Sequence, residues 1–236
     1  SKLNDMKYYS LSFLFILISS FVFGQDFENS KFRIKNIGTY ANTKYSDYGP
    51  VITADESVLY FTSKRPLSEK GKKKEKEEFE NVYMIKKKGR SFRMSSIMPA
   101  PINMEFINNS IIGLSNDGQR MLLYRDVVHE NEANGDIFES KLEGDTWTEP
   151  VSLGEPINYP ESHESTASIA PDGKTIYFVS DREGGKGGRD LYRCTKESDG
   201  SWGKVENLGD SINTTEDEEA VYIHPDGRTL YFSSKG

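Results

Sequence analysis

Short stretches in which apolar and polar residues alternate follow one another along most of the chain. In TIYFVS, residues 175–180, successive side chains point to opposite faces of an extended strand. The strand expected before it, STASIA, ends at Asp172-Gly173, where glycine can take the positive φ that a tight hairpin turn requires. Two further strands are expected, DLYRCTK at 190–196 and WGKVENL at 202–208. The pattern predicts four short antiparallel strands in succession.

This four-strand pattern repeats. The segments LSNDGQRMLLYRD, IAPDGKTIYFVSD and IHPDGRTLYFSSK align on Asp117, Asp172 and Asp226, which are 55 and 54 positions apart, and ITADESVLYFTSK is an earlier, degenerate copy. The same spacing recurs at Phe92, Trp147 and Trp202 and at Asn103, Asn158 and Asn213. We assign a structural role to the repeated turn residues Asp55, Asp117, Gly118, Asp172, Gly173, Asp226 and Gly227. Repeats of this length indicate stacked units of supersecondary structure.

Four antiparallel strands per repeat are typical of β-propeller blades. We therefore expect an all-β chain, a β-propeller of four-stranded antiparallel blades with repeats at about 44–103, 104–158 and 159–213 and an incomplete one at 214–236. The segment FRIKNIG at 32–38 resembles the fourth strand of a repeat. Because propellers usually need about four to eight blades to close, we expect about three full blades plus partial ones, a truncated propeller from a longer protein.

The first part of the chain has a different pattern. Met6-Lys7 precedes the apolar stretch YYSLSFLFILISSFVF, which ends at the small residue Gly24. This pattern predicts that 1–24 hold a secretory signal peptide with upstream carry-over at 1–5, and that the partial propeller occupies 25–236. The alternative is an uncleaved membrane anchor, although the apolar part is short for a membrane span. We expect an exported protein, periplasmic or associated with the outer membrane, with no transmembrane span after cleavage.

Composition narrows the classes of partner. The formal charge of −7 and the acidic isoelectric point disfavour binding to nucleic acid, which depends on basic patches. The single cysteine, Cys194, cannot form an intrachain disulfide, and its place in a strand-like segment favours a packing role. Trp147 and Trp202 occupy the same position of the repeat, and repeats bury a continuous core. This favours packing between blades, rather than exposed carbohydrate platforms, for these two residues.

Known catalytic and cofactor motifs are incomplete in this sequence. The glycine cluster at 184–188 is not followed by the Gly-Lys-Ser/Thr start of a helix that a phosphate-binding loop requires, so we expect a hairpin loop. His163-Glu164 lacks the second histidine of a zinc protease motif, and GLSND around Ser115 is a near miss of a hydrolase elbow, because Asp117 stands where the second glycine is required. We predict a non-enzymatic protein with no catalytic residues, cofactor or metal site. The competing hypothesis is a propeller hydrolase, or a propeller that gates a downstream hydrolase domain.

One periodic polar position is a candidate for binding. It lies eight residues before each turn aspartate and is occupied by Asp47, Asn109, Glu164 and Glu218. We expect an inner strand to begin at this position, near the mouth of the central channel of the propeller. If these side chains point inward, they could bind a basic partner or Ca²⁺. The alternative, which we favour, is that each accepts hydrogen bonds from the adjacent loop backbone. The mixed Lys and Glu run at 70–80 is expected to be a solvated hairpin insertion.

The last two repeats carry a family resemblance. PDGKTIYFVSDREGGKGGRDLY and WGKVENLGDSINTTEDEEAVYIHPDGRTLYFSSKG resemble the WD40-like Pro-Asp repeat of TolB-type bacterial propellers, especially in envelope proteins that also carry tetratricopeptide and OmpA-like domains. The resemblance implies a non-enzymatic scaffold or protein-binding propeller with a protein partner in the cell envelope, within an outer-membrane or secretion-associated assembly. It implies peptidoglycan binding only through a further domain. The first repeat departs from the motif with Ala54-Asp55-Glu56, and the second has Asn116 in place of proline.

Overall fold

The computed structural model describes residues 34, 36–66, 79–89, 91–129 and 132–236. The chain divides into a first unit ending at Asn36 and a second unit, Ile37–Gly236, that contains every strand described below. The predicted signal peptide and most of the charged insertion lie outside the described residues, as do residues 32, 33 and 35; the described residues of the 32–38 segment are not in a strand.

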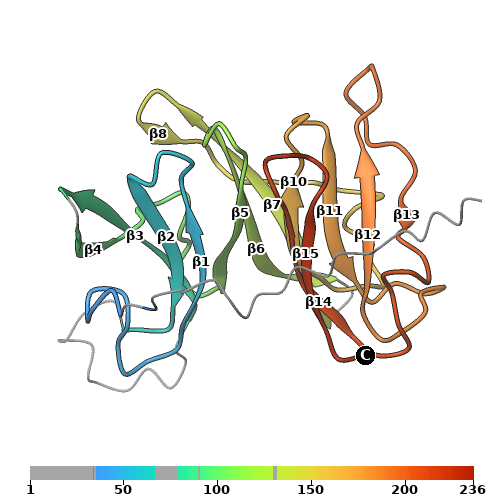
Figure 1. The fold of residues 1–236 in the computed structure, drawn as a ribbon, viewed down its shortest axis with the longest axis horizontal. Helices are drawn as coiled ribbons and strands as arrows, with labels where there is room; N and C mark the ends of the chain where they lie inside the picture. The colour runs from blue at the N-terminus through green and yellow to red at the C-terminus, as the bar shows by residue number, and fades with distance from the viewer. Residues whose placement is uncertain (1–33, 35, 67–78, 90, 130–131) are drawn as a thin grey trace, which may run out of the picture. The chain divides into compact units, whose positions relative to one another are not determined.

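The second unit consists of four antiparallel sheets (Figure 1). The first sheet has the order β1 (Asp47–Ile52), β2 (Val58–Ser63), β3 (Asn81–Lys88) and β4 (Ser91–Ile97). The second contains β5 (Asn109–Leu114), β6 (Arg120–His129) and β7 (Glu132–Glu143), with the short β8 (Thr146–Trp147) and β9 (Val151–Ser152) both paired to β7. The third has the order β10 (Glu164–Ile169), β11 (Thr175–Ser180), β12 (Asp190–Thr195) and β13 (Glu206–Asn207). The fourth pairs β14 (Glu218–Ile223) with β15 (Leu230–Ser234).

The sheets are blades in the predicted order. Strands β1, β5, β10 and β14 each begin a sheet, and contacts join β1 to β5, β5 to β10, and β10 to β14. Among the described strands, β1 and β14 at the two ends of this row do not contact each other. The predicted all-β propeller architecture is confirmed, with three blades followed by a two-stranded sheet. No helix in the described ranges has the length and apolar character needed to cross a membrane.

The fourth strand is shorter than predicted in the second and third blades, whereas β4 of the first blade has seven residues. In the third blade the strand expected at 202–208 is reduced to Glu206–Asn207, and Trp202 makes only an isolated bridge to Lys196. In the second blade, Pro150 lies between β8 and β9. Proline has no backbone N–H to donate to the ladder, so the outer edge of this blade is divided into two short strands.

Both faces of the middle strands pack against neighbouring blades. On β11, Ile176 and Phe178 belong to a core that includes Leu122 of the second blade, whereas Val179 belongs to a core with Val221 of the fourth sheet. The alternation read from the sequence therefore serves two interfaces at once. Cys194 is buried in the first of these cores, as the packing hypothesis predicted, and Trp202 packs against it. Trp147 is buried beside Tyr60 of the first blade, which agrees with packing between blades.

The glycine cluster at 184–188 contacts the next sheet. A side-chain carbon on Gly187 would overlap the carbonyl oxygen of Glu216, and one on Gly188 would overlap the carboxylate of Asp217. The backbone N–H groups of Lys186 and Gly187 donate to the carboxylate of Asp190 at 2.5 and 3.0 Å. The loop between β11 and β12 therefore uses its donors within its own blade, and its glycines allow close approach to the segment that leads into β14.

Candidate functional site

The turn aspartates of the last two repeats share one hydrogen-bonding arrangement, whereas Asp55 and Asp117 accept a hydroxyl from the residue two positions before them, Thr53 or Ser115, and the N–H of the residue two positions after them. The Asp172 carboxylate accepts the N–H groups of Lys174 and Thr175, both at 2.8 Å, and the Thr175 hydroxyl at 2.7 Å. Asp226 accepts the corresponding groups of Arg228 and Thr229. Burial alone would raise the pKa of Asp172, but these bonds outweigh it and hold the pKa below its usual value.

The residue after the turn aspartate takes a left-handed conformation in every repeat. Gly118, Gly173 and Gly227 have φ of 70°, 67° and 67°. In the first repeat Glu56 occupies this position with φ of 58°, a conformation that an L side chain rarely adopts. The departure from the Pro-Asp-Gly pattern at Ala54-Asp55-Glu56 therefore leaves the shape of the turn unchanged.

The four periodic polar residues all lie where the sequence placed them, at the first position of the inner strands β1, β5, β10 and β14. Asn109, Glu164 and Glu218 are fully buried, with 0% of their surface exposed. Each of the four side chains hydrogen-bonds groups of its own blade or of the loop that leads into it. Any ligand at Asp47, Asn109, Glu164 or Glu218 would therefore compete with these internal hydrogen-bond partners.

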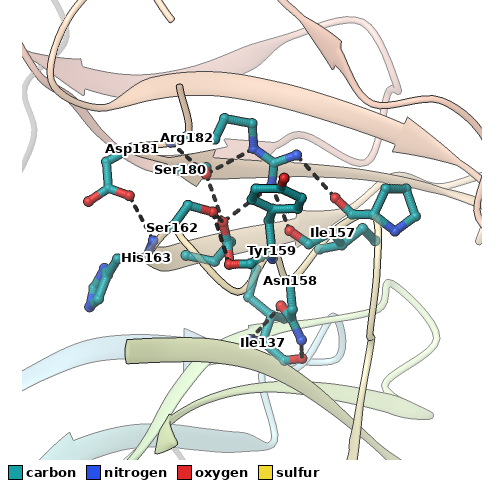
Figure 2. A network of polar contacts seen from close by, with 11 residues as sticks. Ile137, Ile157, Asn158, Tyr159, Ser162, His163, Ser180, Asp181 and Arg182 are labelled. Atoms are coloured by element: carbon teal, nitrogen blue, oxygen red, sulfur yellow. Dashed lines mark hydrogen bonds and ion pairs between the residues drawn. The ribbon is translucent and has the colours of Figure 1, made fainter. Parts of the chain in front are cut away.

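Figure 2 shows the arrangement around the start of β10. The Oε1 atom of Glu164 accepts the hydroxyls of Ser162 at 2.6 Å and Ser180 at 2.7 Å, and Arg182 lies 3.2 Å from the same oxygen. The other oxygen accepts the N–H of Tyr159 at 3.3 Å. Burial raises the pKa of Glu164, while the hydroxyl bonds and the Arg182 charge oppose that rise.

The same arrangement recurs on β1. The Asp47 carboxylate accepts the Ser63 hydroxyl at 2.6 Å and an Arg65 N–H at 2.7 Å, together with the N–H and hydroxyl of Thr43. Burial would raise the pKa of Asp47, but these bonds outweigh it and lower the pKa. On β14, Glu218 likewise accepts the hydroxyls of Ser234 and Thr214.

The arginine of this arrangement also anchors the loop before the inner strand. Arg182 donates to the carbonyl oxygens of Pro156 and Ile157 at 3.0 and 2.6 Å (Figure 2), and its guanidinium lies over the rings of Phe178 and Tyr192. Arg65 lies over Phe61 and Tyr83 in the same way. Stacking on aromatic faces suits the planar guanidinium better than the compact ammonium group of lysine.

The second blade reaches the same result with different residues. The periodic polar position is occupied here by Asn109. The residue opposite it on the paired strand is Arg125, whereas the first and third blades have a serine opposite this position. Arg125 donates to the carbonyl oxygens of Pro101 and Ile102, which correspond to Pro156 and Ile157 one repeat later. Burial lowers the pKa of Arg125. A guanidinium therefore holds this loop in both blades, although it is attached two residues earlier in the second.

The periodic asparagines join each such loop to the third strand of its blade. Asn158 accepts the N–H of Ile137 and donates to the carbonyl of the same residue, both at 2.9 Å (Figure 2). Asn103 makes the same pair of bonds with Val82, and Asn213 with Leu191. A side-chain amide thus pairs with one residue of the third strand, both where the fourth strand is short, as in the third blade, and where it has seven residues, as in the first.

The inner strands line an open pocket of about 900 Å³, here called the inner pocket. Residues of β1, β5, β10 and β14 form most of its wall, including Val51, Ile52, Ile111, Val221 and Tyr222. Among its described lining residues, the charged side chains are Glu56 and Glu80, and none is a lysine or an arginine. Its wall is therefore largely apolar with negative charge.

One part of this wall holds a set of polar side chains, here called the polar cluster. It consists of Tyr48, Glu80, Ser110, Tyr124, Asp126 and His163, of which Asp126 lies behind Tyr124. The Ser110 hydroxyl donates to Glu80 at 2.5 Å, and the Tyr124 hydroxyl donates to Asp126 at 2.7 Å. The Tyr124 oxygen lies 3.1 Å from Nε2 of His163.

Electrostatics in the polar cluster disfavour further negative charge. Burial raises the pKa of Tyr48, and a hydrogen bond to the Glu80 carboxylate adds to the shift. Burial also raises the pKa of Tyr124, and a hydrogen bond to Asp126 adds to it. Lys64, 3.3 Å from the other oxygen of Glu80, is the nearest counter-charge among the described residues. The two tyrosines therefore remain neutral donors beside two carboxylates.

The sequence did not single out the polar cluster. Its members come from three blades and, apart from Tyr48 and Ser110, which each follow a periodic polar residue, they lie at positions that share no common period. One feature of the sequence could have indicated the cluster. Tyr48, Ser110 and His163 each lie next to one of the periodic polar residues. His163 was considered only as part of a zinc motif, and Glu80 only as the end of the charged insertion.

No family model matches the chain, and no curated protein matches it. Among solved structures, it is similar to a Mycobacterium tuberculosis puromycin-hydrolyzing peptidase (12% identity, TM-score 0.44), covering 81% of this chain and 26% of that one. It is also similar to the Swd1 β-propeller domain of Myceliophteria thermophila (12%, TM-score 0.43, covering 81% and 49%). A third is the periplasmic gluconolactonase of Pseudomonas aeruginosa (12%, TM-score 0.39, covering 79% and 64%). This chain spans about a quarter to two thirds of these solved chains.

Proposed function

We propose that this chain is the propeller part of a non-enzymatic protein-binding scaffold in a bacterial cell envelope, and that the inner pocket holds the partner. The observation that carries the proposal is the composition of the inner pocket, which combines an apolar wall with two carboxylates, Glu56 and Glu80, and no lysine or arginine among its described lining residues. Protein-binding surfaces of this kind pair an apolar centre with a few oriented polar groups.

The contacts of the described histidines support binding over catalysis. His163 is hydrogen-bonded to Tyr124, and Nδ1 of His224 accepts the N–H of Asp226 within an exposed turn. A general base in acyl transfer needs a nucleophile within hydrogen-bond reach, and the partners of these two rings are a tyrosine hydroxyl and a backbone N–H.

The envelope location rests on the sequence. The apolar segment ending at Gly24 supports export, and the Pro-Asp-Gly turns of the last two repeats support the TolB-type resemblance. Within such an assembly, peptidoglycan contact is assigned to a further domain of the parent protein and not to the propeller.

A hydrolase is the second candidate, and one observation favours it. Glu80 lines the pocket and Asp126 belongs to the same polar cluster, where it accepts the Tyr124 hydroxyl, and pairs of carboxylates act as acid and base in glycoside hydrolysis. A panel of chromogenic glycosides and peptides separates the two candidates. Turnover that is lost in Glu80→Gln would favour the hydrolase.

Site-specific crosslinking tests the protein-binding proposal. A photoreactive phenylalanine analogue replaces Ile52, which is half exposed and lines the inner pocket. In a matched control the analogue replaces Val151, an exposed residue of the outer strand β9. We expect one discrete crosslinked envelope protein, identified by mass spectrometry, from position 52 and not from position 151. Identical products from both positions, or none from position 52, would contradict the proposal.

A further inference from the structure

We propose that the polar cluster is a subsite for a lysine or arginine side chain of a partner segment lying along the inner strands. The inference rests on the proposed function, in which the inner pocket receives a protein partner. It adds the chemistry that the pocket selects, a cationic group at the end of a flexible side chain.

Charge complementarity is the first argument. The polar cluster contains two carboxylates, Glu80 and Asp126, and Lys64 is the cation paired with Glu80 at 3.3 Å. The Lys64 side chain is 38% exposed, so its ion pair is weakened by solvent and readily exchanged. Among the described side chains, those that donate hydrogen bonds to Asp126 are neutral, Tyr124 and Asn108. One positive charge from a ligand would bring this part of the wall close to neutral.

The aromatic side chains supply the second argument. Tyr48 lines the inner pocket with 41% of its surface exposed, and burial together with the neighbouring Glu80 carboxylate raises the pKa of its hydroxyl group. A cation near a tyrosine ring gains from the negative face of the ring, in addition to the carboxylate beside it. An aliphatic stem leading to that cation would lie on the apolar wall formed by Val51 and Ile52.

The hydrogen-bond chain through His163 is the third argument. The single hydroxyl proton of Tyr124 goes to Asp126, so the bond between Tyr124 and His163 needs Nε2–H of the imidazole as its donor. In the neutral ring Nδ1 is then an acceptor, and this buried atom has no partner among the described residues. A buried polar atom without a partner is unfavourable. His163 lines the inner pocket, and an N–H donor that displaces the groups covering Nδ1 would relieve it.

Fluorescence anisotropy with the full chain provides the test. The probes are fluorescein-labelled Ser-Val-Xaa-Val-Ser peptides in which the central residue is lysine, arginine, norleucine or glutamate. At about 50 mM salt, where screening is moderate, we expect the lysine and arginine peptides to bind at least about tenfold more tightly than norleucine, and glutamate to bind most weakly.

Variants assign the preference to the polar cluster. Glu80→Gln should weaken lysine-peptide binding by about tenfold and leave norleucine-peptide binding unchanged. The matched control is Glu56→Gln, the other carboxylate of the wall, which is paired with Lys87 and should have no effect. His163 is one of three histidines in the chain, so its imidazole signals can be followed by NMR. They should shift with the lysine peptide and not with norleucine.

The outcomes separate this inference from the proposed function. Equal affinity for all four peptides would overturn the cationic subsite and leave a protein-binding pocket intact. Crosslinks from Val151 but not from Ile52 would overturn the proposed function itself. If peptides bind only after the lysines of the 70–76 run are replaced by glutamine, the occupant is a segment of this chain, and the partner subsite is wrong. The comparison of the lysine and norleucine peptides uses the unaltered protein, so it tests the cationic preference even if Glu80→Gln does not fold.

Discussion

Glu164 illustrates how one buried side chain organises the entry to a blade. Its two oxygens collect two serine hydroxyls, a backbone N–H and the guanidinium of Arg182. The equivalent residue in the second blade, Asn109, is neutral, and the guanidinium comes from Arg125. The two side chains share one acceptor oxygen, which receives the N–H of the residue five positions earlier, Tyr159 or Met104, and they do not share charge.

This difference predicts the effect of two substitutions. Glu164→Ala leaves Ser180 and Arg182 without their shared acceptor and should lower the free energy of unfolding by about 3 kcal/mol, as expected for a broken buried pair. The loss stays at the lower end of the usual range because Arg182 keeps its bonds to Pro156 and Ile157. Glu164→Gln keeps one acceptor oxygen and should cost about 1 kcal/mol. Urea unfolding measures both, and equal losses would show that charge is the requirement.

At the scale of elements, the loop between β11 and β12 joins two blades. The N–H of Glu218, the first residue of β14, donates to the carbonyl of Arg189 at 2.8 Å, directly after the glycine cluster. Gly187 and Gly188 allow this approach because a side-chain carbon at either position would overlap the 216–217 segment. The glycine cluster is thus explained by contact between blades.

Gly187→Ala should separate the loop from β14. Its added carbon would overlap the Glu216 backbone, so we expect loss of the bond between Glu218 and Arg189 and at least tenfold faster hydrogen exchange at the Glu218 amide, a change of about 1.4 kcal/mol. The control is Gly184→Ala in the same loop. Its φ of 86° makes alanine strained, but no atom lies near the added carbon. Exchange at Glu218 should therefore change only in the first variant, and equal effects would mean that backbone strain is responsible.

At the scale of the whole second unit, each blade is stabilised by its neighbours. The middle strand β11 contributes to cores on both of its faces, whereas on β15 Tyr231 and Phe232 are exposed by 54% and 39%. Units that contact only adjacent units derive much of their stability from those interfaces. The fourth sheet, joined to the third blade through β10, β11 and β12, therefore has less packing than the blade before it.

Hydrogen exchange measured by mass spectrometry can test this gradient. Peptides covering β14 and β15 should exchange faster than peptides covering β11 and β12, because local opening of the fourth sheet disrupts one interface and not two. The comparison is internal to one sample, so it needs no variant. Uniform protection across 164–234 would mean that the unit opens as a whole.

Periodicity in the sequence determined the number, order and hairpin turns of the blades. Local physics suffices for these features, because alternating side chains specify a strand, and an aspartate followed by glycine specifies a turn wherever it occurs. The strand at 175–180 agrees with its prediction residue for residue. The fourth strands of the second and third blades are shorter than predicted. Pro150 interrupts pairing in the second blade, and Trp202 makes only an isolated bridge in the third, and neither effect is visible from the periodic tryptophans.

Only the tertiary structure determined the inner pocket and its polar cluster. Glu80 follows the charged insertion, Tyr124 lies on β6 and His163 precedes β10, and no spacing in the chain relates these three residues. They meet because β1, β5 and β10 lie in a row, which brings side chains from three blades to one wall. The sequence by itself determined a propeller with a repeated polar position at the start of each inner strand. Packing between blades decided which neighbours of that position form the proposed subsite for a cationic side chain. Contacts between blades depend on distances that periodicity does not encode.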